Sequence, residues 1–259
     1  MILTRGLKQL ANVVMRPWYT FINRSDTDGA LHFMNYGFQG EDPVPLLDAD
    51  EAERFPIQLY HETASGADLK GRDLLEVGCG RGGGLSYLHR YLEPASARGV
   101  DLNAQAIAFC SASYPDIAFQ VMDAQQLDFP DASFDAVINV ESSHRYPDFA
   151  AFVAEVHRVL RPGGHFLFAD FRYAGMVTPM REDIAAAGFR TVRSQVINDQ
   201  VLAALRADAE RRVGLIRKYL PRGFRGAALE FAGTPGTRLY RSFERQRRVY
   251  VCMALVKEG

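Results

Sequence analysis

The sequence Asp73-Leu-Leu-Glu-Val-Gly-Cys-Gly-Arg-Gly-Gly-Gly-Leu-Ser-Tyr-Leu88 decides the fold. A short apolar run at residues 74–77 is interrupted by glycines, and apolar residues then resume at helical spacing. This pattern predicts a strand, a tight turn and a helix. Gly78 and Gly80 permit positive φ angles and let the backbone approach a ligand without a Cβ, while the first amides of the helix point at that ligand. The stretch therefore predicts a site for a nucleotide-like molecule.

The glycine spacing alone leaves the kind of ligand open. Gly78, Gly80 and Gly83 match the dinucleotide-binding fingerprint, whereas Gly78, Gly80 and Gly82 match a tighter spacing. An ordinary structural turn is a third interpretation. Residues further along the chain have to decide among these three.

Composition indicates a globular protein that works away from nucleic acid. The 259 residues are 47% hydrophobic and 24% charged, which suffices for a full core in one domain, or in one domain with an elaborated cap. A net charge of −1 gives no general attraction to nucleic acid. The three cysteines are far apart in sequence, with no zinc or disulfide spacing, and favour a reducing cytoplasm. No apolar run is long enough to span a membrane, and we expect no metal.

The N-terminal residues form a separate pattern. Residues 1–24 carry four basic side chains and no acid, interleaved with apolar residues at helical spacing up to Pro17. A helix packed on its own domain and an interfacial helix that touches a membrane or lipid both fit this pattern. Residues 25–47 are expected to form a loop or lid, and a helix is expected within residues 50–64, with Pro56 starting or interrupting it. We expect residues 1–65 to act as a helical lid.

From residue 73 onward, strands and helices alternate. The expected strands are residues 74–77, 98–102, 117–122, 134–140 and 165–170. A helix at residues 149–160 is expected to stop at the turn Arg161-Pro-Gly-Gly. Such an alternation predicts a parallel sheet with helices on both faces and ligands at the carboxyl ends of the strands.

The C-terminal third departs from the alternation. We expect a helix at residues 179–187, a strand at 189–197, Arg- and Ala-rich helices within 199–233, and a last strand at 249–256. Residues 66–259 would then form the ligand-binding domain, with a helical insertion at about 199–246. Together with the N-terminal lid, this insertion is a candidate roof for the site.

Two acids follow predicted strands at positions that suit a nucleoside. Asp101 ends the second strand, at about the distance from the glycine turn where an acid commonly binds the ribose hydroxyls. Asp123 ends the third strand, where a carboxylate can accept a hydrogen bond from an adenine amine. Asp123 could also cap a helix. Both positions support a cofactor that contains adenosine.

Several motifs together resemble the class I S-adenosylmethionine-dependent methyltransferases. They are Glu76-Val-Gly-Cys-Gly-Arg-Gly, Asp101, Asp123-Ala with Leu127-Asp-Phe-Pro, Phe134-Asp-Ala-Val, and Leu160-Arg-Pro-Gly-Gly. Val140-Glu-Ser-Ser-His-Arg-Tyr-Pro and Asp170-Phe-Arg narrow the resemblance to the actinobacterial phthiotriolone and fatty-acid O-methyltransferases. The resemblance implies a Rossmann-like α/β fold: a seven-stranded, mostly parallel sheet with an antiparallel C-terminal strand and a helical cap.

The resemblance also implies how S-adenosylmethionine is held. Glu76, Gly78, Cys79 and Gly80 would border its amino-acid half, Asp101 and Leu102 the ribose, Asp123 and Ala124 the adenine, and Val140 and Glu141 the sulfonium. Arg81 follows the second glycine of the motif, and a positive charge is unfavourable beside a cationic cofactor. We therefore expect Arg81 to face solvent.

His144 and Asp170 are the candidate catalytic residues. They follow the fourth and fifth strands, whose carboxyl ends would meet if the two strands are neighbours. A histidine suits a general base that removes the proton of a hydroxyl acceptor, and a carboxylate on its other nitrogen would orient it. Related sugar O-methyltransferases resemble this chain in having a His and an Asp in these roles. A loop histidine and a capping aspartate remain the alternative.

These observations predict an O-methyltransferase that acts on a hydroxyl of a hydrophobic lipid, polyketide or glycolipid, with Trp18 and Tyr36 as candidate acceptor-binding residues. A C-methyltransferase or non-methylating cyclase on the same fold is one alternative. A nicotinamide-dependent oxidoreductase and a non-catalytic binding subunit are two others.

Overall fold

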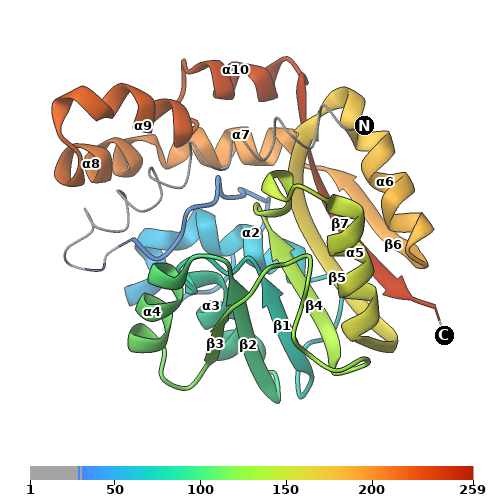
Figure 1. Ribbon diagram of the computed structural model, residues 1–259. Coiled ribbons are helices and arrows are strands. Elements are labelled where there is room, and N and C mark those ends of the chain that lie inside the picture. Colours follow the sequence, from blue (N-terminus) through green and yellow to red (C-terminus); the bar gives the residue numbers. More distant parts are fainter. Residues whose placement is uncertain (1–28, 30, 259) are drawn as a thin grey trace.

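A computed structural model describes residue 29 and residues 31–258 of the chain (Figure 1). The expected helix up to Pro17 and the side chain of Trp18 lie outside the described residues. The interpretation of residues 1–24 as an interfacial or a packed helix therefore stays open.

Seven strands in the described part of the chain form one sheet, in the order β3-β2-β1-β4-β5-β7-β6. The strands are β1 (Asp73–Val77), β2 (Ser96–Asp101), β3 (Ala118–Val121), β4 (Phe134–Val140), β5 (Leu160–Tyr173), β6 (Phe189–Val196) and β7 (Arg248–Lys257). Neighbouring strands among β1 to β5 pair in parallel, and β7 runs antiparallel to both β5 and β6. The predicted sheet, mostly parallel with an antiparallel last strand, is confirmed.

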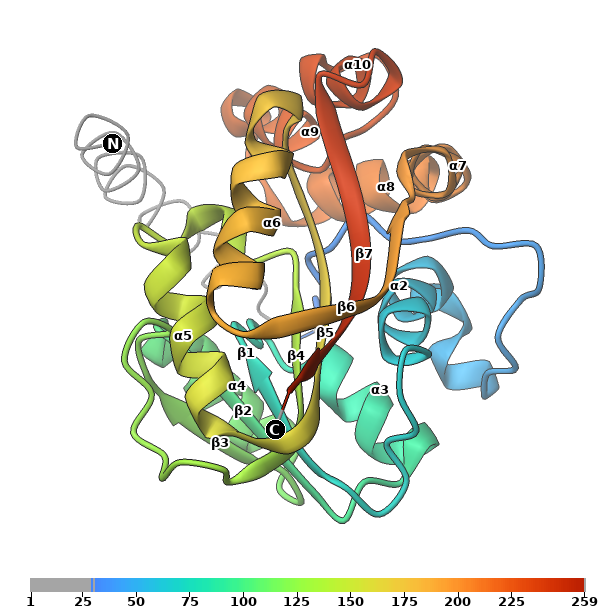
Figure 2. The ribbon, with the colours of Figure 1, turned by 90° about the vertical axis from the view of Figure 1, so that its right-hand side faces the viewer.

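Helices cover both faces and one edge of this sheet. They are η1 (Asp48–Glu53), α2 (Arg54–Ala64), α3 (Gly83–Leu92), α4 (Ala104–Ser113), η2 (Ser143–Arg145), α5 (Phe149–Val159), η3 (Ala174–Met176), α6 (Val177–Ala186), α7 (Asn198–Ala207), α8 (Ala209–Tyr219), η4 (Arg222–Phe224), α9 (Arg225–Phe231) and α10 (Arg238–Glu244). Figure 2 shows α5 and α6 on one face and α2 and α3 on the other. In Figure 1, α7 to α10 lie across the edge where the parallel strands end. Pro56 lies in the first turn of α2, where a proline is tolerated.

The alternating side chains of the strands supply two separate apolar layers. Leu74 of β1 and Ile138 of β4 belong to the cluster that also contains residues of α2 and α3. Their neighbours Leu75 and Val137 belong to the cluster that contains residues of α5 and α6. Because successive side chains of a strand point to opposite faces, the almost unbroken apolar runs of β1 and β4 are what a sheet covered on both sides requires.

The turn expected at Arg161-Pro-Gly-Gly is an irregularity within β5. The strand starts at Leu160, which pairs with Phe134, and the next paired residue on β5 is His165, opposite Ala136. Gly163 has a φ of 77°, and the Arg161 guanidinium forms ion pairs with Asp73 (2.9 Å) and Asp135 (2.8 Å). The expected strand boundary at residue 165 was wrong because the chain bulges out of the sheet and then rejoins it.

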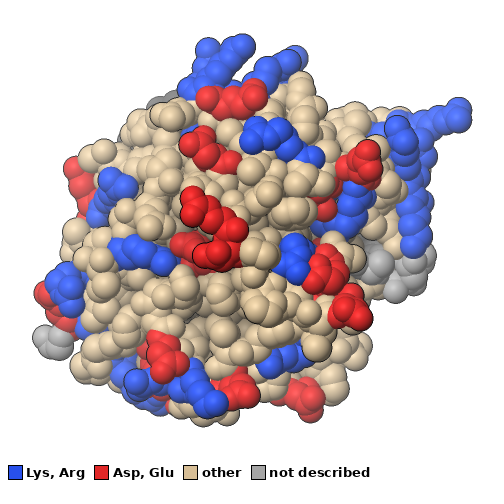
Figure 3. Space-filling view, turned by 180° about the vertical axis from the view of Figure 1, so that it is seen from behind, with Lys and Arg blue, Asp and Glu red and all other residues tan. Residues whose placement is uncertain are grey.

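On the side of the molecule opposite to that in Figure 1, acidic and basic side chains are interspersed (Figure 3). Figure 3 also shows a run of basic side chains along one edge of that face, at the upper right of the view.

Candidate active site

The glycine turn after β1 has the geometry that the sequence predicts. Gly78, Gly80 and Gly82 have φ angles of 77°, 54° and 75°. The amides of Gly78 and Cys79 donate to the Val100 carbonyl of β2, at 2.7 and 3.0 Å. A Cβ at Gly78 would lie 2.2 Å from Ser142 Oγ, whereas a Cβ at Gly80 would meet no atom within 4 Å. Packing therefore requires glycine at residue 78, and the backbone at residue 80 is left open to a ligand.

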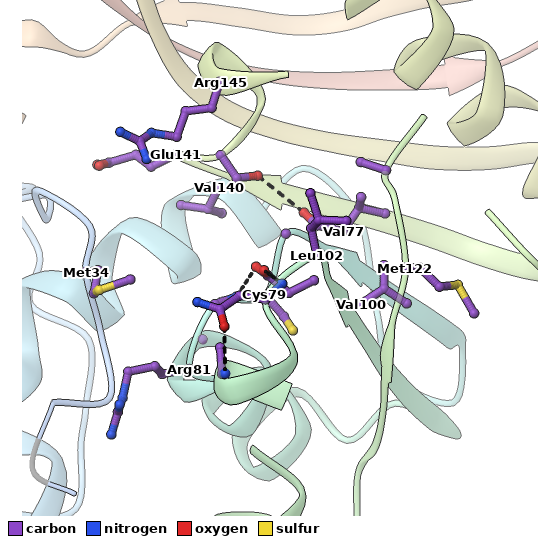
Figure 4. Close-up of a pocket in the computed structure, with 18 of the residues that line it drawn as sticks. Met34, Val77, Cys79, Arg81, Val100, Leu102, Met122, Val140, Glu141 and Arg145 are labelled. Atoms are coloured by element: carbon purple, nitrogen blue, oxygen red, sulfur yellow. Dashed lines mark hydrogen bonds between the residues drawn. The ribbon is translucent and has the colours of Figure 1, made fainter. Parts of the chain in front are cut away.

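A cavity of about 950 Å³ opens beside this turn, at the carboxyl ends of β1, β2 and β4 (Figure 4). Strand-end residues Val77, Val100 and Val140 line it, as does Met34 from the segment that precedes η1. A ligand site outside the carboxyl ends of parallel strands is the general rule for open α/β sheets. The volume is at the upper end of the range for small-molecule sites.

Most of the residues that we expected to bind a cofactor line this cavity. They are Gly78, Cys79, Gly80, Asp101, Leu102, Asp123, Ala124, Val140 and Glu141. Glu76 is not among the lining residues. It is fully buried, it accepts a hydrogen bond from the Tyr60 hydroxyl (2.7 Å), and burial raises its pKa to about 7. Its Oε2 is buried and has no hydrogen-bond partner among the residues that the structure describes.

The two nucleoside-binding candidates also hold the local backbone. Asp101 accepts hydrogen bonds from the amides of Gly80 (2.9 Å) and Asn103 (2.8 Å), so it ties β2 to the glycine turn. Burial raises the pKa of Asp101, although these amides oppose that shift. Asp123 accepts from the backbone amide (2.9 Å) and the side chain (3.0 Å) of Gln125, in a turn rather than at a helix start. The expectation that both acids bind a nucleoside stays a prediction.

The expectation that Arg81 faces solvent was wrong. Arg81 is only 3% exposed, and its guanidinium carbon lies 3.6 Å from the centroid of the Phe109 ring on α4. A cation over an aromatic face is attracted by the ring quadrupole. The sequence gives no sign of this contact, because the arginine and the aromatic ring are 28 residues apart.

The structure brings His144 and Asp170 together as predicted. His144 Nδ1 lies 2.8 Å from Asp170 Oδ1, and the His144 amide donates to Asp170 Oδ2 at 2.8 Å. This contact forms because β4 and β5 are neighbours, so that η2 after β4 meets the carboxyl-terminal half of β5. The imidazole also lies against Phe171, with a ring-centroid separation of 4.3 Å. His144 itself does not line the cavity, but Ser142 and Arg145 on either side of it do.

The surroundings of this pair fix its charges. Asp170 is fully buried, accepts from the Ser143 hydroxyl (2.6 Å) and forms an ion pair with Arg172 (3.0 Å). Burial alone would raise the pKa of Asp170, but His144, Arg172 and the hydrogen bonds lower it below its ordinary value. For His144, burial lowers the pKa more than the nearby carboxylate raises it. At neutral pH the pair is therefore an ionised carboxylate with a neutral imidazole.

Tyr36 lies outside the cavity, in a position that the sequence did not indicate. The residue is 8% exposed, its ring packs against Phe171 and Phe243, and its amide donates to Glu141 Oε1 at 2.8 Å. The residues of this segment that do line the cavity are His32, Phe33, Met34 and Asn35. Sequence reasoning also missed Tyr60 and Arg145 as lining residues. The other acceptor-binding candidate, Trp18, is not described.

A search of known proteins gives methyltransferases as relatives of this chain. A family model described as a methyltransferase domain matches residues 75–168. The phthiotriol/phenolphthiotriol dimycocerosates methyltransferase of Mycobacterium tuberculosis is 42% identical over 89% of this chain and 87% of its own length. The fatty-acid O-methyltransferase of Mycolicibacterium smegmatis is 38% identical over 92% of this chain and 88% of its own.

Solved structures agree on the fold. The cyclopropane synthase MmaA2 from Mycobacterium tuberculosis has a TM-score of 0.69, with 17% identity over 92% of this chain and 94% of its own. At this identity the similarity concerns the fold alone. The sequence relatives are methyltransferases, which favours an S-adenosylmethionine site over a dinucleotide site at the glycine turn.

Proposed function

Because this chain belongs to the class I S-adenosylmethionine-dependent methyltransferases, in the group of the phthiotriol and fatty-acid enzymes, we propose that it methylates a hydroxyl oxygen of a hydrophobic lipid. The observation that carries the choice of oxygen is the hydrogen-bonded pair of His144 and Asp170 at the carboxyl ends of β4 and β5. Such a pair is suited to removing a hydroxyl proton. Methylation at carbon also releases a proton, so the preference for oxygen rests in addition on the relative named as an O-methyltransferase.

The cavity residues suit S-adenosylmethionine. The backbone at Gly80 is open to a ligand, and the Asp101 carboxylate keeps acceptor capacity beyond its two amide hydrogen bonds. Bound there, the cofactor supplies an electrophilic methyl group. We assign its amino-acid half to the glycine turn, its ribose to Asp101 and Leu102, its adenine to Asp123 and Ala124, and its sulfonium end to Val140 and Glu141.

His144 then acts as the general base. Its Nδ1 is held by Asp170, and its Nε2 has no hydrogen-bond partner within the described part of the chain. Nε2 is therefore available to accept the acceptor's hydroxyl proton. Asp170 keeps the imidazole in one orientation and stabilises the imidazolium that forms. Because methyl transfer is an in-line displacement, the remaining contribution of the protein is to hold the acceptor oxygen in line with the methyl carbon.

The side chains near the cavity also suit an apolar acceptor. Phe33 and Met34, in the segment that we expected to form a loop or lid, line the cavity. We propose that this segment and α7 to α10 together form the roof that admits the acceptor. Residues 1–24 remain a candidate lipid contact. No helix within residues 31–258 is both long and apolar enough to cross a bilayer.

The proposal is tested by an acceptor series. We expect kcat/KM to rise along hydroxylated acyl compounds of increasing chain length, by up to about fourfold per methylene that becomes buried, since burial of one CH₂ contributes about 0.8 kcal/mol. The measurement is methyl incorporation from labelled cofactor, with free sugars and catechols as polar controls. Equal rates on those controls and on long-chain alcohols would contradict a lipid acceptor.

Asp101→Ala is expected to weaken S-adenosylmethionine binding by about 1.5–3 kcal/mol, because it removes a charged acceptor from the ribose hydroxyls. Titration calorimetry measures the change, and Asp116→Ala on the exposed surface is the control. Because Asp101 also fixes the Gly80 amide, a melting curve of the variant must accompany the titration. Unchanged affinity in a folded variant would place the ribose elsewhere.

A further inference from the structure

Glu141 has a backbone conformation that few residues of its kind adopt. It directly follows β4 and has a φ of 48°, in the left-handed region, and its amide donates to the Ala169 carbonyl of β5 at 2.8 Å. A residue with a Cβ is uncommon there and costs about 1–2 kcal/mol relative to the ordinary helical conformation. Strain of this kind gathers at functional sites, where the surrounding structure imposes it. Here it directs the Glu141 side chain to the rim of the cavity, which the residue lines.

One carboxylate oxygen of Glu141 holds two different parts of the chain. Oε1 accepts from the backbone amide of Tyr36 at 2.8 Å and from the hydroxyl of Tyr250 on β7, also at 2.8 Å. Tyr250 is fully buried in the sheet. Through these two hydrogen bonds, Glu141 connects the backbone at Tyr36 to the core of the domain.

An arginine of α8 binds the backbone carbonyl groups of the same segment. The Arg212 guanidinium, which is buried, donates to the carbonyls of Asn35 and Tyr36 at 3.1 Å each and is itself held by Asp208 at 2.9 Å. Tyr36 is thus bound by an acid at its amide and by a base at its carbonyl. The residues just before it, His32 to Asn35, form one wall of the cavity. These contacts therefore hold one wall of the cavity in place.

Glu141 is a titratable group that lines the cavity, so a charge in the cavity would act on its carboxylate. Burial raises the pKa of Glu141 to about 8, and the nearby Asp170 carboxylate adds to this rise. The hydrogen bonds from Tyr36 and Tyr250 and the charge of Arg212 lower the same pKa. A cation in the cavity would favour the ionised carboxylate. An ionised carboxylate accepts stronger hydrogen bonds than a neutral one. Transfer of the methyl group to the acceptor leaves a neutral thioether and removes that cation.

We propose that Glu141 is a positioning residue whose hydrogen bonds hold the segment from His32 to Gly37 over the cavity, as a latch. This latch is tighter when the cavity holds the methyl-bearing cofactor than when it holds the demethylated product. The inference rests on the proposed function, because it takes the sulfonium as the cation. Such a latch lets the enzyme close over S-adenosylmethionine and loosen once the methyl group has been transferred.

Two variants test the hydrogen bonds of Glu141 and its charge separately. Glu141→Gln keeps an oxygen that can accept both hydrogen bonds but removes the charge, so the Kd for S-adenosylmethionine should rise about 10-fold while the Kd for S-adenosylhomocysteine changes less than about 2-fold. Glu141→Ala removes the acceptor, so amide hydrogen exchange across residues 32–37 should speed up at least 10-fold without any ligand. Glu182→Gln, on the exposed face of α6, is the control for both.

The measurements are titration calorimetry with each cofactor form and hydrogen exchange followed by mass spectrometry. Equal changes in the two affinities of Glu141→Gln, or no change, would overturn the charge dependence. Unchanged exchange in Glu141→Ala would overturn the latch. If Glu141→Ala does not fold, Tyr250→Phe is the second variant, since it removes one donor and should also speed exchange at residues 32–37. Failure of the wild-type protein to bind either cofactor form would instead overturn the proposed function.

Discussion

His144→Ala is expected to lower kcat about 10²- to 10⁴-fold and to leave the Kd for S-adenosylmethionine nearly unchanged. The size of the effect is that of losing a positioned general base. Cofactor affinity should persist because the imidazole lies outside the lining of the cavity, against Phe171 and Asp170. Steady-state turnover and titration calorimetry on the same preparation measure the two quantities.

The pH profile gives a second readout of the same residue. The pKa of His144 is lowered by burial, so the neutral, proton-accepting form predominates above that pKa. We expect kcat of the wild-type protein to fall as pH drops through a value below about 6.5, and this limb to disappear in His144→Ala. His165→Ala, at the amino-terminal part of β5, is the control and should retain the limb. A loss of cofactor affinity with kcat preserved would instead make His144 a binding residue.

Asp170→Ala should lower the free energy of unfolding by about 3–5 kcal/mol, the largest effect on stability that we expect. Asp170 is fully buried and accepts from the Ser143 hydroxyl and from the amides of His144 and Phe171. It also pairs with Arg172, whose side chain is 9% exposed. Removing one partner of such a pair leaves a buried charge and several buried donors without a partner.

Urea denaturation followed by circular dichroism measures this loss. Asp170→Asn keeps the shape and some acceptor capacity, so it should lose less stability than Asp170→Ala while still lowering kcat. Asp116→Ala, at an exposed position, should stay within about 0.5 kcal/mol of the wild type. If Asp170→Ala were as stable as that control, the buried network around Arg172 would not contribute to folding.

The features predicted correctly from sequence are those set by local pattern and strand order. The glycine turn follows from residues 78–82 alone, and the apolar runs of β1 and β4 follow from burial on both faces. The contact between His144 and Asp170 was predicted on the condition that β4 and β5 are neighbours, and the strand order of the sheet meets this condition. Each of these inferences uses a short stretch or a general rule of α/β topology.

The features that the sequence did not predict depend on contacts between distant residues. Arg81 finds the Phe109 ring on another helix, and the amide of Tyr36 finds a side chain 105 residues away. The bulge after Leu160 depends on Arg161 reaching both Asp73 and Asp135. Local propensity carries no information about such partners, since tertiary contacts select them.

The position of β7 has a consequence for how the protein is made. This strand comprises residues 248–257, near the end of the chain, yet it lies between β5 and β6 in the sheet. During synthesis β6 emerges before β7, the strand that joins it to β5. Until β7 has been made, β5 and β6 therefore each expose an unpaired strand edge, and such edges are prone to pair with other chains.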